Sequence, residues 1–172
     1  QAKECRLKTV DAAQRPLAAI WWWQAKTRTA VVESANVIGL AMLPRGKFHP
    51  FQLDTFGLGA VLQAAIKKGA RRIIVGIGGS ATNDGGFGLA RALGWKFLNR
   101  RGTEITDWTA LTSLEKIKRP RPLRKGLITV AVDVQNPLLG PRGATRIYGP
   151  QKGIRAPDIL PAERSLRRLA QV

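Results

Sequence analysis

The sequence predicts an α/β fold, with a mixed sheet, flanking helices and antiparallel strands at the N-terminus. Two observations lead to this prediction. The first third of the chain alternates between short apolar or β-branched segments and tight turns, as in a meander of antiparallel strands. After about residue 55, helical and strand-like segments follow one another, which is typical of a unit with parallel pairing. With 172 residues, 44% of them hydrophobic, the chain can bury a sizeable core.

Three strands are expected in the first third, over residues 5–10, 17–24 and 29–33, with turns at 11–16 and 25–28. The second strand carries three consecutive tryptophans, Trp21, Trp22 and Trp23. We interpret them as part of the core and as apolar cover at the surface. Stacking on a base or a ligand is the less favoured alternative.

The pattern then changes from strands to helices. Residues 34–43 are consistent with one short helix, and 44–54 with an irregular link. Asp54 or Thr55 can cap a helix that carries apolar residues at helical spacing and ends at Gly69. An apolar strand over 72–77 follows, and no apolar run in the chain is long enough to cross a bilayer.

A glycine-rich loop, 78-GGSATNDGG-86, follows this strand. We expect a helix after it that ends at Gly94, a strand over 95–98, and a polar, proline-broken stretch to residue 126. A strand of the buried type is expected over 128–134, followed by glycine-rich loops. The final segment, 163–171, has helical spacing.

The charge is strongly positive, with 29 Lys and Arg against 11 Asp and Glu, a formal net charge of +18. A basic surface favours anionic partners of any kind, from nucleic acids to phosphorylated metabolites. The basic residues are scattered, however, and the densest run, 118-KRPRPLRK-125, has two prolines and is expected to be an exposed loop. The single cysteine, Cys5, excludes an intrachain disulfide and fits a reducing compartment.

The glycine-rich loop is a candidate anion site, because it leaves the carboxyl end of a strand and opens a helix. Its glycines permit positive φ and let backbone N–H groups turn toward an anion. The pattern is neither a P-loop nor a good dinucleotide fingerprint. Asp84 beside such a cradle suggests a Mg²⁺ ligand or a base for a substrate hydroxyl. Equally, the polar residues of the loop can be simple turn and cap residues.

A second group of residues strengthens the functional interpretation. Asp133 lies at the end of the strand expected over 128–134, and it is followed by 136-NPLLGPRG-143 and 149-GPQKG-153. If the two strands are neighbours, Asp84 and Asp133 meet at one edge of the sheet, with Arg142 and Lys152 on flexible loops nearby. Two carboxylates and two cations are the groups that phosphoryl transfer needs. In a purely structural interpretation, Asp133 caps a turn.

These motifs carry a family resemblance. The sequence resembles the bacterial-type glycerate kinases in 33-ESANVIGL-40, 55-TFGLG-59, 71-RRIIVGIGGSATNDGG-86 and 132-VDVQNPLLGPRGATRIYGPQKG-153. The last two are long and distinctive, and the resemblance covers essentially the whole chain. Asp54 departs from it, where a Ser or Thr is usual, and so does Ala131, in a region where a Cys-Asp pair is common.

The resemblance implies a cytoplasmic enzyme that uses ATP and Mg²⁺ to phosphorylate D-glycerate to 2- or 3-phosphoglycerate. It also implies that residues 1–172 are the central segment of a two-domain protein, mostly its inserted α/β domain, without the family's N- and C-terminal parts. We therefore expect little activity from this chain alone. The alternatives are a basic nucleic-acid-binding module, a nicotinamide-dependent enzyme and a truncated or decayed gene product. The chain has no recognisable helix for reading bases, which argues against the first, and it lacks the acid that the second needs about 20 residues after its glycine fingerprint.

The residues expected to act divide into two groups. Asp84 and Asp133 are the candidates for catalysis and for binding Mg²⁺. The candidates for binding substrate or phosphate are Gly78, Gly79, Ser80, Thr82, Asn83, Gly85, Gly86, Asn136, Arg142 and Lys152.

Overall fold

The computed structural model describes residues 1–120 and 127–172. Its main feature is a five-stranded sheet in the order β1-β2-β3-β4-β7. The strands are β1 Lys3–Val10, β2 Pro16–Gln24, β3 Thr29–Glu33, β4 Arg72–Gly76 and β7 Ile128–Ala131. The first three are antiparallel, while β3, β4 and β7 are parallel. The predicted mixed sheet with an antiparallel start is confirmed.

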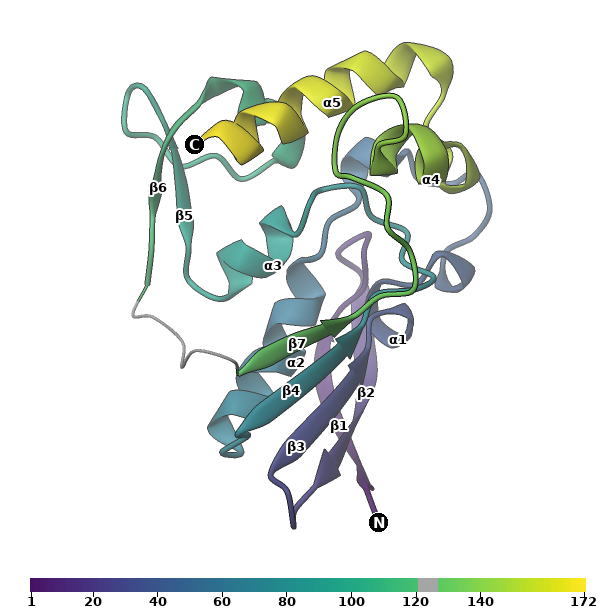
Figure 1. The fold of residues 1–172 in the computed structure, drawn as a ribbon, viewed down its shortest axis with the longest axis vertical. Helices are drawn as coiled ribbons and strands as arrows, with labels where there is room; N and C mark the ends of the chain where they lie inside the picture. The colour runs from purple at the N-terminus through teal and green to yellow at the C-terminus, as the bar shows by residue number, and fades with distance from the viewer. Residues whose placement is uncertain (121–126) are drawn as a thin grey trace.

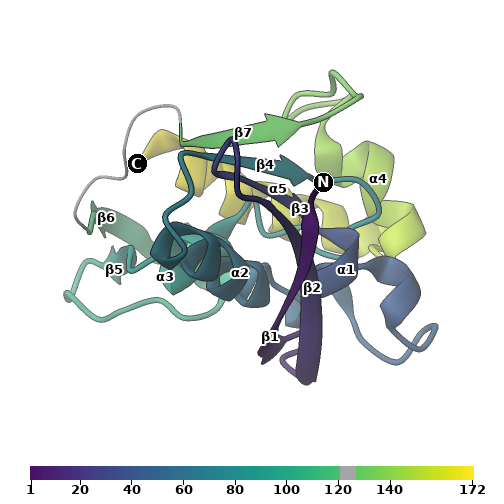
Figure 2. The same cartoon turned by 90° about the horizontal axis from the view of Figure 1, so that it is seen from below.

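Helices flank this sheet (Figure 1). They are α1 Ala35–Ile38, α2 Phe56–Lys67, α3 Phe87–Ala92, α4 Ala144–Lys152 and α5 Ala156–Gln171, with 3-10 turns η1 Leu40–Met42, η2 Pro50–Gln52 and η3 Trp108–Ser113. A separate antiparallel pair is formed by β5 Lys96–Asn99 and β6 Leu114–Lys118. Figure 2 shows α2 and α3 together on one side of the sheet.

Two apolar clusters hold the elements together. One lies between the sheet and α2, and includes Trp21, Val32 and Ile73. The other joins α5 to η3, α3 and β5, with Trp108 and Leu166 among its buried members. Trp21 is buried, whereas Trp22 and Trp23 are half-buried, as expected for a tryptophan run that serves both core and surface.

Three predicted elements differ in the structure. The helix expected over 34–43 is broken at Gly39, where the backbone turns extended and a Cβ would lie 2.2 Å from the Ala35 carbonyl oxygen. The strand expected over 95–98 is present as β5, but it pairs with β6 outside the main sheet. The strand expected over 128–134 ends at Ala131. It is not of the buried type, because it is the edge strand and Val130 is 52% exposed.

The C-terminal part is more helical than predicted. The segment 149-GPQKG-153, expected to be a flexible loop, is the end of α4, whose last turn contains Pro150 and which ends at Gly153 with φ +99°. Helix α5 begins at Ala156, well before the predicted 163. Of the basic run 118–125, Lys118 ends β6, and residues 121–125 lie outside the described residues.

Within residues 1–120 and 127–172, no helix combines the length and apolar character that crossing a bilayer requires.

Candidate active site

The two strands that precede the predicted site are neighbours. Strand β4 pairs with β7 in parallel, with Ile73 opposite Ile128 and Gly76 opposite Ala131. The glycine-rich loop and the segment 132–143 therefore leave the sheet at the same edge. This adjacency is the geometric condition on which the predicted site depends, and the structure meets it.

Asp84, however, lies eight residues beyond β4, and its carboxylate is directed into the protein. The residue is 1% exposed. Oδ2 accepts hydrogen bonds from Thr55 N (2.9 Å), Thr55 Oγ1 (2.7 Å) and Gly88 N (2.9 Å), and Oδ1 accepts one from Gly86 N (3.2 Å). The N–H groups of Gly86 and Gly88, at the start of α3, therefore donate to the protein's own carboxylate and not to a ligand anion. Asp84 joins the start of α3 to the start of α2.

The loop has the backbone that its glycines predict. Gly79, Gly85 and Gly86 have positive φ angles of 69°, 60° and 82°. Gly79 and Ser80 pair with the chain at residues 39 and 40, through a bridge between Gly39 and Ser80 and a bond from Leu40 N to Gly79 O (2.9 Å). Gly78 and Gly79 are exposed. The first half of the loop is therefore the part that a ligand can reach.

The second predicted carboxylate, Asp133, lies on the exposed arm after β7. On this arm Asn136 donates to Arg142 O (3.0 Å) and accepts from Tyr148 Oη. Arg142 itself is exposed on the turn before α4. No contact of the described residues joins Asp133 to Asp84, and neither lines the cavity described below.

Helix α4 is tied to the glycine-rich loop by two polar contacts. The Lys152 ammonium donates to the carbonyl oxygen of Thr82 (2.6 Å), and Asn83 Nδ2 donates to the buried Thr145 Oγ1 (3.1 Å). Burial lowers the pKa of Lys152, and the negative charge of Asp84 partly opposes this shift. Lys152 is thus placed by its contacts against the loop, and no carboxylate of the described residues forms an ion pair with it.

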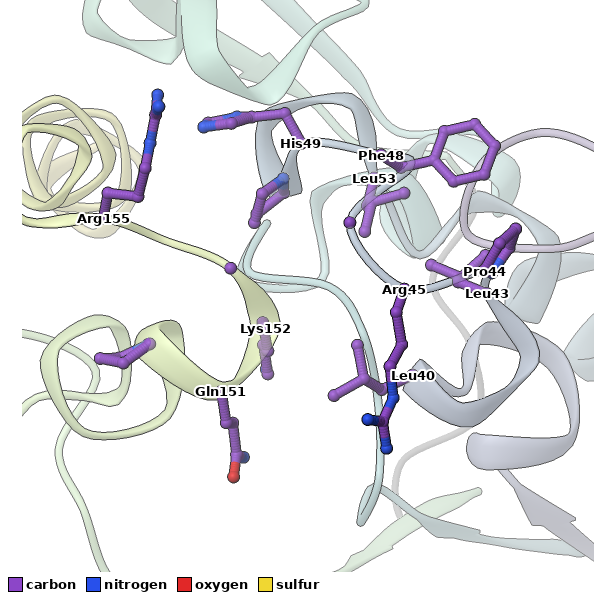
Figure 3. A pocket seen from close by; sticks show the side chains of 14 residues that line it. Leu40, Leu43, Pro44, Arg45, Phe48, His49, Leu53, Gln151, Lys152 and Arg155 are labelled. Carbon is purple, nitrogen blue, oxygen red and sulfur yellow. The ribbon is translucent and has the colours of Figure 1, made fainter.

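Beside this contact is a cavity of about 580 Å³ (Figure 3). One wall comes from residues 40–53 and the other from residues 150–155. Leu40 and Leu43 supply apolar surface, while Arg45, Lys152 and Arg155 supply positive charge, and none of the lining residues is acidic. The residues that line it are Leu40, Leu43, Pro44, Arg45, Gly46, Phe48, His49, Pro50, Leu53, Pro150, Gln151, Lys152, Gly153 and Arg155.

The two walls are held together at one end by Asp158. Its Oδ2 lies 3.2 Å from His49 Nε2 and accepts from Arg155 Nε (3.1 Å) and Arg155 N (3.0 Å). The side-chain and backbone hydrogen bonds from Arg155 keep the pKa of Asp158 below its usual value. Since Phe51 N donates to His49 Nδ1 (3.3 Å), a neutral His49 would carry its proton on Nε2 and donate it to Asp158.

Sequence reasoning found Lys152 but missed the other polar residues of the cavity, Arg45, His49, Gln151 and Arg155. The only signal was the basic and aromatic character of 45-RGKFHPF-51, inside a segment that was interpreted as a link. Nothing in the sequence indicates that this segment faces the end of α4, because that contact depends on tertiary packing.

The described residues do not fit a protein-bound metal cage. They bring together no group of three or more His, Cys, Asp or Glu side chains. Asp84, one of the two predicted Mg²⁺ ligands, is 1% exposed, and its Oδ2 already accepts three hydrogen bonds.

Comparison with known proteins agrees with the motifs. The sequence model of the glycerate kinase family matches residues 1–172. The glycerate kinase of Bacillus subtilis (strain 168) is 44% identical over 149 residues, which are 84% of this chain and 39% of that protein. The glycerate 2-kinase of Escherichia coli (strain K12) is 41% identical over 159 residues, which are 90% of this chain and 42% of that protein.

A solved structure agrees with the fold as well. A crystal structure assigned to glycerate kinase 2 of Salmonella typhimurium LT2 superposes with a TM-score of 0.91 at 33% identity, over 99% of this chain and 47% of that one. The chain thus spans less than half the length of these relatives. The match over all 172 residues, together with the fold and the motifs, shows that the chain belongs to the glycerate kinase family.

Proposed function

We propose that this chain supplies part of the active site of an enzyme that transfers the γ-phosphoryl group of ATP to a hydroxyl group of D-glycerate. Family membership supports the reaction. We further propose that residues 1–172 correspond mostly to the inserted α/β domain of a two-domain kinase. The reaction would take place in the cytoplasm, where ATP is available.

The observation that carries the proposal is the placement of Lys152. Its ammonium group donates to Thr82 O in the glycine-rich loop, at the edge of a cavity that no described acidic residue lines, and no described carboxylate forms an ion pair with it. Phosphoryl transfer proceeds with negative charge on the phosphoryl oxygens, and a fixed, partly desolvated cation stabilises that charge. Burial disfavours the charged form of this lysine until an anion binds beside it, so an anionic substrate is the expected partner.

The other candidate residues take the following roles in this proposal. The exposed backbone of Gly78 and Gly79, with Ser80, binds a phosphate or the glycerate carboxylate. Asp133, on its exposed arm, is the candidate base for the glycerate hydroxyl, and Arg142 is a further cation on the same arm.

The buried half of the loop acts indirectly. Asp84 is a positioning residue, because its hydrogen bonds hold the start of α3 and its charge favours the protonated form of Lys152. Thr82 and Asn83 fix the loop to α4 through their contacts with Lys152 and Thr145. Gly85 and Gly86 have positive φ angles, which permit the turn between Asp84 and the start of α3. Mg²⁺ enters the proposal as part of the Mg·ATP substrate, and no step is assigned to it.

Segment exchange tests the proposal. Residues 1–172 would replace the matching segment of the Escherichia coli glycerate 2-kinase, and ADP release would be measured with D-glycerate and Mg·ATP. We expect turnover from the exchanged enzyme and little from the isolated chain, which spans about 40% of such a relative. Lys152→Gln in the exchanged enzyme should lower kcat by about 10²-fold, as expected for removal of a group that stabilises developing charge.

Lys47→Gln is the matched control, because Lys47 is an exposed cation on the same segment as Arg45 but does not line the cavity. It should leave kcat within about twofold. A folded exchanged enzyme that binds both substrates without turnover, or full turnover after Lys152→Gln, would contradict the proposal.

A further inference from the structure

The cavity between residues 40–53 and residues 150–155 is larger than a site for glycerate needs to be. Its volume is about 580 Å³, within the range of about 300–1,000 Å³ that is usual for sites of larger organic ligands. A three-carbon acid would fill only a small part of it and would leave the apolar wall in contact with water. The cavity therefore suits a larger molecule than the phosphoryl acceptor.

The chemistry of the two walls indicates the kind of molecule. Leu40 and Leu43, both half-buried, form an apolar surface, and the exposed Pro150 adds to it from the other wall. Burying such surface favours a ligand with an apolar or aromatic part by about 25 cal/mol for each Å² removed from water. Neither an inorganic anion nor glycerate has such a part.

The charges of the cavity indicate the rest of the ligand. Figure 3 shows Arg45 and Gln151 on opposite sides of the opening, with Lys152 on the same wall as Gln151. Arg155 is engaged by Asp158, whereas no described carboxylate pairs with Arg45 or Lys152. Two cations that form no ion pair with any described residue, in a cavity that no described acidic residue lines, favour a ligand with several negative charges, such as adjacent phosphate groups.

We propose that this cavity binds the nucleotide of the reaction, with the nucleoside against Leu40 and Leu43 and the phosphates at Arg45 and Lys152. The inference rests on the proposed function for the identity of the polyphosphate. In this arrangement the phosphate chain lies at Lys152, whose ammonium group also donates to Thr82 O in the glycine-rich loop.

Calorimetric titration of the 172-residue chain with ADP tests the inference without requiring turnover. Arg45→Gln and Lys152→Gln should each weaken ADP binding by about tenfold or more, the usual effect of losing a charge-assisted bond. Lys47→Gln removes the same charge from the same segment and should change binding less than about twofold. This control separates a built site from general attraction to a chain of net charge +18.

A second comparison tests the apolar wall. ADP should bind more tightly than pyrophosphate, which has the same linked phosphates and no nucleoside. Leu40→Ser, at a half-buried position, should weaken ADP binding severalfold and leave pyrophosphate binding unchanged. Circular dichroism of each variant confirms that it is folded.

The outcomes separate this inference from the proposed function. Binding of D-glycerate instead of ADP, lost in Lys152→Gln, would overturn the nucleotide assignment and leave the kinase proposal intact. Equal binding of ADP and pyrophosphate, or an equal effect of Lys47→Gln, would overturn it as well. Specific ADP binding together with an inactive exchanged enzyme would support this inference and contradict the proposed reaction.

Discussion

Replacement of Asp84 by Asn tests whether this carboxylate is mainly structural. The side chain is 1% exposed and accepts hydrogen bonds from Thr55 N, Thr55 Oγ1, Gly86 N and Gly88 N. An Asn side chain can offer its oxygen to the three donors that now reach Oδ2. Its amide group then faces Gly86 N–H, so two donors oppose each other and one bond is lost.

The size of the effect follows from these bonds. A hydrogen bond to a charged group contributes about 1.5–3 kcal/mol and a neutral one about 0.5–1.5 kcal/mol. Weakening three bonds by about 1 kcal/mol each and losing the fourth gives a gross loss of about 5 kcal/mol. Relief from burying a charge offsets part of it, so we expect the free energy of unfolding to fall by about 3–5 kcal/mol.

The assay is urea unfolding of the 172-residue chain, followed by circular dichroism, with Asp54→Asn as the matched control. Asp54 is a neighbouring carboxylate, and its Oδ1 accepts from Phe56 N and Gln14 Nε2. Burial, and then the charge of Asp84, raise the pKa of Asp54. Because a raised pKa means that the folded state favours the neutral acid, the ionised form costs stability at neutral pH.

Asp54→Asn should therefore change the free energy of unfolding by less than about 1 kcal/mol at pH 7, with a tendency to stabilise. This tendency should disappear as the pH falls below 3.8, the ordinary pKa of an aspartate, where Asp54 is neutral in both states. If Asp84→Asn cost no more than Asp54→Asn, the structural role of Asp84 would be refuted. If it left stability unchanged and abolished turnover of the exchanged enzyme, Asp84 would act directly in catalysis.

Three further predictions follow from particular contacts. Gly88→Ala should lower the free energy of unfolding in urea by about 1–3 kcal/mol, because the added Cβ would lie 2.6 Å from the backbone nitrogen of Phe56. Gly78→Ala, with no atom within 4 Å of the added Cβ, should lower it much less. Equal effects of the two variants would show that α3 and α2 do not pack this closely. ADP binding should weaken as the pH rises through the lowered pKa of Lys152, because the ammonium group loses its proton. Near that pH, binding should take up a proton, which is measured as a dependence of the binding enthalpy on the buffer. Lys152→Gln should abolish this uptake, and an absence of uptake in the unsubstituted chain would exclude the ammonium group from the site. Val132→Lys should change the free energy of unfolding by less than about 0.5 kcal/mol, because Val132 is 54% exposed; a larger loss would restore the prediction of a buried strand there.

Much of the fold can be predicted because its signals are local. The antiparallel start, the strand over 72–76 and the helix after it follow from alternation, β-branched residues and glycine stops. Helix α4 could not be predicted in this way. It contains Gly149 and Pro150, which argue locally for a loop, and packing of the buried Gly149 beside Ile154 overrides that preference.

The sequence by itself determined that a glycine-rich loop follows the strand at 72–76 and that a carboxylate lies within it; that β4 and β7 are neighbours was a condition of the predicted site, which the structure meets. Only the tertiary structure decided where the side chains point. Asp84 faces inward because buried backbone donors at the starts of α2 and α3 need an acceptor, and a carboxylate inside the protein satisfies several of them at once. The cavity with Arg45 and Lys152 likewise depends on contacts between segments about a hundred residues apart, which no local pattern records.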